Sequence, residues 1–191
     1  IIRNSVGYTH ANVKICATHA GITVGEDGAS HQTFEDIALM RTIPGMTVIN
    51  PSDGVSAEAL IRQAVEYEGP CYVRLGRAAV PDFYNAGDYI MLGRGNWLRR
   101  GKDATIVATG IMVSEAVTAA AALAESGIDA GVIDIHTIKP IDEEILTEAA
   151  GIGPIVTAEE HSVIGGLGSA VAETLSRRRP VRIEMVGQKD T

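Results

Sequence analysis

The run T-H-A-G-I-T-V-G-E-D-G-A-S-H-Q-T-F-E-D, residues 18–36, places two histidines and two acids among glycines: His19, Glu26, Asp27 and His31. Imidazoles titrate near neutral pH and can pass protons to and from hydroxyl groups, and a carboxylate can hold a hydroxyl by accepting its hydrogen bond. Glycines let the backbone approach a ligand. From these residues alone, a functional site and a capped polar surface loop both remain open.

Two further segments could bind an anion. Arg77 closes the run G-P-C-Y-V-R-L-G-R, where a guanidinium could hold a phosphate or form a surface salt bridge. The run G-G-L-G-S-A, residues 165–170, opens a predicted helix whose free amides could do the same. It lacks the spacing of a Walker loop or a dinucleotide fingerprint, which favours a structural turn.

The remaining histidines are weaker candidates. His161 follows Glu159 and Glu160 and could act as a ligand or base, but three polar residues at a strand end favour a structural role. His136 lies inside an apolar strand and is predicted to be a core histidine with hydrogen-bond partners. The sequence contains no H-E-x-x-H, C-x-x-C or G-x-S-x-G motif, so zinc and serine hydrolysis have no support.

Short apolar runs alternate with helical periods, which predicts an α/β fold of two units with mostly parallel sheets. The first run, 13–18, is expected to be a buried strand, and the polar loop follows its carboxyl end, where such folds build their sites. Ser52 or Asp53, and Asp142, are predicted to cap helices. Strands are predicted at 13–18, 46–49, 69–77, 104–110, 129–140, 154–161 and 181–187, and helices at 34–43, 55–67, 113–126, 142–150 and 169–176. The predicted domains are residues 1–80 and 104–191, joined by a linker at 81–103.

Composition excludes several classes of function. The net charge of −8 argues against nucleic-acid and anionic-membrane partners, which require a basic face. No run approaches the ~20 apolar residues of a membrane span. Cys16 and Cys71 are expected to be small core residues in a reducing, cytoplasmic compartment. The first residues contain neither Met nor a signal peptide, which suggests a fragment or subunit of a larger protein.

The polar loop closely resembles the transketolase signature T-H-D-S-x-G-x-G-E-D-G-P-T-H-Q-P-x-E, and the likeness continues to residue 77. D-A-T-I-V-A-T-G, I-K-P-I-D and V-T-A-E-E-H-S-V-I-G-G-L-G-S-A-V-A-E resemble the transketolase C-terminal domain. The chain looks most like the short C-terminal subunit of split bacterial transketolases. This implies a thiamine-diphosphate-binding fold with an incomplete pyrimidine domain, followed by a C-terminal-domain-like fold.

The resemblance implies ketol transfer between sugar phosphates, as in the pentose phosphate pathway, with thiamine diphosphate and Mg²⁺. Residue by residue, His19 resembles the family histidine near the phosphate end of the sugar, and Asp27 the aspartate that reads its 2-hydroxyl. His31 is similar to the histidine near the reacting carbon, and Arg77 to the arginine that binds the substrate phosphate. These residue types suit hydroxyl recognition, anion binding and proton transfer.

The sequence departs from the family pattern at Ala20 and Ala29, where the family has Asp and Pro. The family glutamate that activates the aminopyrimidine, and the aromatic residue stacked on it, are expected upstream of Ile1. The resemblance therefore implies an N-terminal subunit or domain that holds the diphosphate and metal, and a homodimer. We expect the chain alone to be catalytically inactive.

Two alternatives remain open at this stage. A 1-deoxyxylulose-5-phosphate synthase shares the architecture, as do the beta subunits of 2-oxo acid dehydrogenases, although the intact G-E-D-G-x-x-H-Q favours transketolase. The chain could also be a non-catalytic assembly domain whose second unit mainly holds a dimer.

Overall fold

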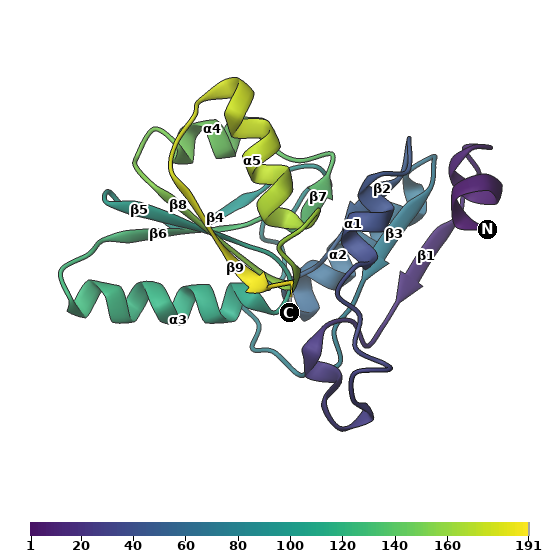
Figure 1. Cartoon of the computed structure of the whole chain (residues 1–191), viewed down its shortest axis with the longest axis horizontal. Helices are drawn as coiled ribbons and strands as arrows, with labels where there is room; N and C mark the ends of the chain where they lie inside the picture. Colours follow the sequence, from purple (N-terminus) through teal and green to yellow (C-terminus); the bar gives the residue numbers. More distant parts are fainter. Residues whose placement is uncertain (191) are drawn as a thin grey trace.

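A computed structural model describes residues 1–190, which form two sheets side by side (Figure 1). The first sheet has the order β1-β3-β2-β7 and the second the order β4-β6-β5-β8-β9. All neighbours are parallel except β7 on β2 and β4 on β6. The predicted α/β class with mostly parallel sheets is confirmed. The strands are β1 (Lys14–Ala17), β2 (Thr47–Ile49), β3 (Cys71–Arg74), β4 (Asn96–Arg99), β5 (Ala104–Ala108), β6 (Ala130–Asp134), β7 (Thr137–Lys139), β8 (Ile155–Ser162) and β9 (Ile183–Gln188).

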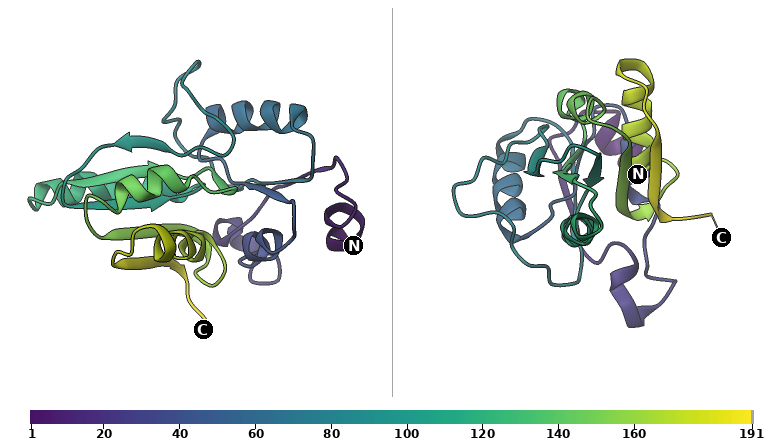
Figure 2. Two further views of the ribbon diagram at one scale, coloured as in Figure 1. Left: turned by 90° about the horizontal axis from the view of Figure 1, so that it is seen from above. Right: turned by 90° about the vertical axis from the view of Figure 1, so that its left-hand side faces the viewer.

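Helices cover both faces of the second sheet, with α3 on one face and α4 and α5 on the other (Figures 1 and 2). α3 buries an alanine-rich stripe, and α5 buries larger side chains such as Leu167 and Leu175. The helices are the π-helical turn η1 (Ile2–Gly7), the 3-10 helix η2 (Ile22–Asp27), α1 (Asp36–Arg41), α2 (Gly54–Glu66), α3 (Met112–Glu125), α4 (Glu143–Ala149) and α5 (Leu167–Arg178).

The helix caps predicted at Asp53 for α2 and at Asp142 for α4 are present in the structure. Asp53 accepts a hydrogen bond from the Ser56 amide while the Ser56 hydroxyl accepts one from the Asp53 amide, which forms a capping box. Asp142 accepts from the Glu144 and Ile145 amides. These short-range signals depend only on neighbouring residues, and both predictions are confirmed.

The expected single strand at 129–140 is instead two strands in different sheets. β6 ends at Asp134, and β7 pairs antiparallel with β2 of the first sheet. The Lys139 ammonium donates to the carbonyls of Arg41 and Ile43, which fixes β7 beside α1. A continuous apolar run does not reveal such a crossing, because both strands are buried.

The segment 81–103, expected to be a linker, contains regular structure. β4 pairs antiparallel with β6 and extends the second sheet. Its backbone is hydrogen-bonded, and the Trp97 indole donates to Glu148 beside the sheet. The glycines, arginines and single proline of this segment made a four-residue edge strand hard to predict from sequence.

The first strand is not buried as the sequence suggested. β1 has β3 as its one neighbour in the sheet, and Cys16 is exposed whereas Cys71 is fully buried. Both cysteines are free thiols. The prediction of two core cysteines is therefore wrong for Cys16, because an edge strand can direct β-branched and thiol side chains outward.

A buried carboxylate joins the two units and the connection between them. Asp134, at the end of β6, accepts hydrogen bonds at Oδ2 from the hydroxyls of Ser52 (2.6 Å) and Tyr84 (2.9 Å). Its Oδ1 has no hydrogen-bond partner within residues 1–190. Burial raises the pKa of Asp134 to about 7, outweighing these hydrogen bonds, which lower it.

The raised pKa predicts a pH-dependent contribution to stability. Between the ordinary value of 3.8 and about 7, the folded protein binds more protons at Asp134 than the unfolded chain. Stability from this group is therefore present at low pH and lost as the pH rises through about 7. Asp134→Asn removes the titration, so between the ordinary value of 3.8 and about 7 the wild type should lose stability relative to this variant by up to about 1.4 kcal/mol per pH unit.

Urea unfolding of the two proteins from about pH 5 to about pH 8 measures this difference. Other titrating groups are common to both proteins and cancel in the comparison. Parallel stability profiles would contradict the prediction.

Candidate active site

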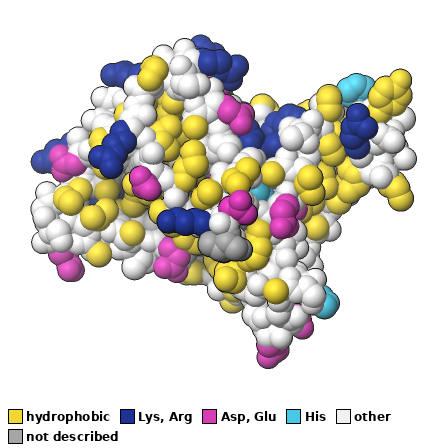
Figure 3. Space-filling view, viewed as in Figure 1, with side chains coloured by type: hydrophobic (Ala, Val, Ile, Leu, Met, Phe, Trp, Pro, Cys, Tyr) yellow, Lys and Arg dark blue, Asp and Glu magenta, His cyan; other side chains and the backbone are white. Residues whose placement is uncertain are grey.

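Loop 18–36 begins at the carboxyl end of β1 and projects away from both sheets (Figure 1 and the right view of Figure 2). It contains η2 and returns to the fold through a bridge between Gly21 and Thr33. Acidic and histidine side chains are visible on this projection (Figure 3). The exposed acidic and histidine residues of the loop are His19, Glu26, Asp27, His31 and Glu35.

Three exposed side chains of the loop, those of His19, Asp27 and His31, make no hydrogen bond or ion pair with a distant residue among residues 1–190. Asp27 has no side-chain hydrogen bond or ion pair with any of residues 1–190. His19 Nδ1 lies 2.9 Å from the Thr18 hydroxyl, and His31 Nδ1 lies 3.0 Å from the Ser30 hydroxyl. These contacts are with adjacent residues and leave the other ring nitrogen of each histidine available to a ligand.

Arg77 contacts the loop from the segment that follows β3. Its Nη1 donates to the Val24 carbonyl at 2.9 Å, and its Nη2 lies 3.7 Å from Glu26 Oε1. The side chain remains 42% exposed. The fold thus brings Arg77 against η2, although the two are more than fifty positions apart in sequence. An arriving anion would compete with Glu26 for the guanidinium.

Behind the loop lies a buried ion pair that sequence reasoning missed. Arg74 Nε donates to Asp36 Oδ2 at 2.8 Å, and the Tyr72 hydroxyl donates to the same oxygen at 2.7 Å. Arg74 Nη2 also donates to the carbonyls of Thr33 and Glu160. One guanidinium therefore connects β3, α1, the loop and the second unit. An arginine inside the apolar run C-Y-V-R-L is the sequence signal, because a buried charge requires a partner.

His161 is buried and acts as a hydrogen-bond acceptor for α1. Its Nδ1 donates to the Ser162 carbonyl at 2.7 Å, which leaves Nε2 to accept from the Ala38 amide at 3.4 Å. Burial lowers the pKa of His161, so the ring is neutral and can accept. His161 does not face the exposed side chains of the loop, which supports the structural role favoured from sequence.

The glycine loop before α5 already holds an anion from the chain itself. Glu159 accepts at both carboxylate oxygens from the amides of Leu167 (2.6 Å) and Gly168 (2.8 Å). Burial raises the pKa of Glu159 to about 7, while these hydrogen bonds lower it. A Cβ at Gly166 would lie 1.9 Å from the Glu159 carboxylate. The prediction of a structural turn is confirmed.

His136 is also a core residue, as its apolar surroundings predicted. It is fully buried, with Nδ1 3.1 Å from the Thr137 hydroxyl and Nε2 3.2 Å from Asn96 Oδ1. Burial lowers the pKa of His136 to about 4, so the ring is uncharged at neutral pH.

The described residues do not fit the charged end of a diphosphate cofactor. Among residues 1–190, no group of three or more His, Cys, Asp or Glu side chains could hold a metal ion. The helix N-terminus best suited to a phosphate, that of α5, is filled by Glu159.

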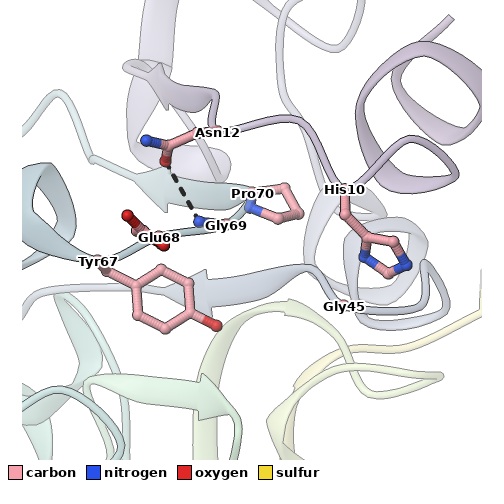
Figure 4. A pocket seen from close by; sticks show the side chains of 7 residues that line it. All are labelled: His10, Asn12, Gly45, Tyr67, Glu68, Gly69 and Pro70. Carbon is pink, nitrogen blue, oxygen red and sulfur yellow. Dashed lines mark hydrogen bonds between the residues drawn. The ribbon is translucent and has the colours of Figure 1, made fainter.

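A cavity of about 460 Å³ lies at the opposite end of the first sheet (Figure 4). It sits where the chain enters β3, and the Gly69 amide donates to Asn12 Oδ1 across it. The exposed histidines of loop 18–36 follow the carboxyl end of β1. The cavity therefore lies at the amino ends of β1 and β3, and the loop lies at the carboxyl end of β1. Its lining residues are His10, Asn12, Gly45, Tyr67, Glu68, Gly69 and Pro70.

Comparison with protein-family models identifies both halves of the chain. Residues 1–82 match the transketolase pyrimidine binding domain, and residues 93–191 match the transketolase C-terminal domain. The chain belongs to the transketolase family. This family depends on thiamine diphosphate. The domain bounds 1–80 and 104–191, with the linker 81–103, stay predictions.

Individual relatives support this assignment. The chain is 46% identical over 187 residues to the 6-deoxy-6-sulfo-D-fructose transketolase subunit SqwH of Clostridium sp., covering 97% of this chain and 58% of that protein. It is 44% identical over 191 residues to a subunit of the apulose-4-phosphate transketolase of Phocaeicola vulgatus, covering 99% and 61%. The chain thus spans little more than half the length of these curated relatives.

A solved structure described as a split gene transketolase, inactive beta4 tetramer, superposes with a TM-score of 0.93. It is 52% identical and the match covers all of this chain and 62% of that one. The expected likeness to the C-terminal part of a split transketolase is therefore confirmed. Within residues 1–190, no helix is long and apolar enough to cross a membrane.

The buried ion pair behind the loop predicts a large loss of stability when it is broken. Arg74→Ala would leave Asp36 buried without its cation and remove the donors to two carbonyls, so we expect a loss of about 3–5 kcal/mol. Arg62→Ala is the control, because Arg62 forms an exposed helical pair with Glu58 and should cost well under about 1 kcal/mol. Urea unfolding of both variants measures the difference. Equal losses would contradict the prediction.

Proposed function

We propose that this chain is the C-terminal part of a thiamine-diphosphate-dependent transketolase, which transfers a two-carbon ketol unit from a ketose phosphate to an aldose phosphate. One observation carries the proposal: Asp27 and His31 are exposed on a projecting loop without distant protein partners, and Arg77 contacts that loop. An exposed carboxylate, an exposed imidazole and a half-exposed guanidinium match a ligand that has hydroxyls, transferable protons and an anionic end.

In this proposal each side chain has one task. Asp27 accepts a hydrogen bond from the 2-hydroxyl of the sugar and so selects its configuration. His31 hydrogen-bonds the donor near the reacting carbon and moves a proton there. His19 lies towards the phosphate end, and Arg77 binds the phosphate by charge-assisted hydrogen bonds.

Thiamine diphosphate and Mg²⁺ would be held mainly by a partner. The described residues offer no metal site, and the chain spans little more than half the length of its curated relatives. We therefore propose an N-terminal subunit or domain that supplies the diphosphate site, with the assembled enzyme acting as a homodimer of such pairs in the cytoplasm. The likeness to a split gene transketolase supports this division of labour.

The anionic end of the substrate is assigned from Arg77 and from the names of relatives. Relatives are named for a sulfonated ketose and for a sugar phosphate. A guanidinium such as Arg77 can bind either anion through two parallel hydrogen bonds. We propose a phosphate, because the loop retains the residues of the general transketolase signature.

Replacing the exposed loop residues should remove activity without removing stability. In the complete enzyme, we expect Asp27→Ala and His31→Ala each to lower kcat/KM for ketol transfer by about 10²–10³-fold, because a hydroxyl acceptor or proton carrier is lost. Their melting temperatures should match the wild type, since neither side chain has a distant protein partner. Steady-state kinetics and thermal unfolding measure the two effects.

Glu125→Ala, which changes an exposed carboxylate at the end of α3, is the matched control and should leave kcat/KM unchanged. If the loop variants alter rates by no more than a few-fold, the chain serves assembly rather than catalysis, and the proposal fails.

The choice of donor separates transketolase from its nearest rival. We expect the complete enzyme to consume a ketose phosphate in the presence of an aldose phosphate and to release no CO₂ from pyruvate. A 1-deoxyxylulose-5-phosphate synthase would give the reverse pattern. Coupled assays with each donor, run on the same preparation, decide between them.

A further inference from the structure

The end of β8 in the second unit reaches across to loop 18–36 of the first unit. Glu160 Oε1 accepts a hydrogen bond from the Thr23 amide at 2.7 Å, and the Ser162 amide donates to the Phe34 carbonyl at 2.9 Å. Glu160 is buried, with only 8% of the residue exposed. These contacts join β8 to both sides of the loop, since Thr23 lies in its first half and Phe34 in its last.

Glu160 supplies a cap that η2 cannot supply itself. Thr23 is the second residue of η2, and the N-cap position is Gly21, which has no side chain to accept a hydrogen bond. First-turn amides of a helix have no partner within the helix, so an acceptor from elsewhere stabilises them. The carboxylate of Glu160 fills this position from a strand more than a hundred residues away.

The backbone at Gly21 is shaped to admit the carboxylate. Its φ is +84°, and a Cβ built there would lie 2.2–2.5 Å from the carboxylate atoms of Glu160. Gly21 also donates to the Thr33 carbonyl at 3.1 Å, which closes the base of the loop beneath the carboxylate. A side chain at this position would displace either Glu160 or the base of the loop.

The placement of Asp27 depends on this cap. Asp27 is the last residue of η2 and has no side-chain partner within residues 1–190, so the backbone sets its direction. That backbone runs from the capped first turn through a kink at Gly25, whose φ of +76° is not helical. Burial of Val24, which is 1% exposed, and a hydrogen bond from the Gln32 side chain to the Ile22 carbonyl also hold η2. Among the hydrogen bonds within residues 1–190, those of Glu160 and Arg77 reach η2 from more than fifty positions away. Arg77 belongs to the first unit and is assigned to the substrate anion, so Glu160 is the support that the second unit supplies.

We propose that Glu160 is a positioning residue for substrate recognition: it caps η2 from the second unit and holds Asp27 in register with the 2-hydroxyl of the sugar. This inference rests on the proposed function. It assigns the second unit a role in selectivity that does not require contact with the substrate.

The test compares three substitutions in the complete enzyme. Glu160→Gln keeps an acceptor oxygen and the shape of the side chain, so it should resemble the wild type within a few-fold. Glu160→Ala removes the acceptor, and Glu160→Asp keeps the charge but withdraws it by one methylene, so both should free the Thr23 amide. Glu184→Ala, an exposed carboxylate on β9 of the same unit, is the matched control.

The kinetic readout is selectivity between two acceptors. With an aldose phosphate that carries the 2-hydroxyl, we expect Glu160→Ala and Glu160→Asp to lower kcat/KM by about 10–100-fold, as misplaced recognition groups do. With the 2-deoxy aldose phosphate, which offers Asp27 nothing to bind, kcat/KM should change by no more than a few-fold. Equal losses with both acceptors would show a merely structural role and overturn the proposal.

A second readout does not depend on activity. Amide hydrogen exchange of residues 22–27 should accelerate at least about tenfold in Glu160→Ala and Glu160→Asp, and remain near wild type in Glu160→Gln and Glu184→Ala. Unchanged exchange in both shortened variants would overturn the proposal even if the wild type transfers ketol units. Faster exchange in a protein whose wild type shows no ketol transfer would refute the proposed function while leaving the cap established.

Discussion

Three consecutive side chains at the carboxyl end of β8 hold three helices in place. Glu159 accepts from the first amides of α5, Glu160 from η2 and His161 from α1. None of these helices receives a side-chain cap from its own N-cap residue. The amino ends of one helix of the second unit and two of the first therefore depend on a single strand end.

This arrangement explains why so many polar groups are buried between the units. Each acceptor at the end of β8 satisfies backbone amides that would otherwise be buried without partners, at a cost in free energy. Burial disfavours the charged form of each acceptor. It therefore raises the pKa of Glu159 to about 7 and lowers the pKa of His161. The Arg74–Asp36 pair lies beside them and compensates part of the charge.

The local sequence pattern predicted most of the strands and helices, and it predicted a polar loop between the first strand and the first α-helix. The caps at Asp53 and Asp142 could be predicted because their partners lie within three residues. Sequence reasoning failed where a role depended on a distant partner: it treated Glu160 as an ordinary strand-end group, and it did not foresee that Asp134 joins the units. Neither partner set can be read from periodicity, since Thr23 and Tyr84 reach these carboxylates only through the tertiary fold.

The crossing of β7 into the first sheet also limits how this architecture can be divided. β2 lies between β3 and β7, and β7 comes from the second half of the chain. Excising that half would expose the edge of β2, a three-residue strand with every residue buried, to pairing with other chains. The two halves therefore cannot be exchanged between proteins like independent modules, and they are expected to be inherited together.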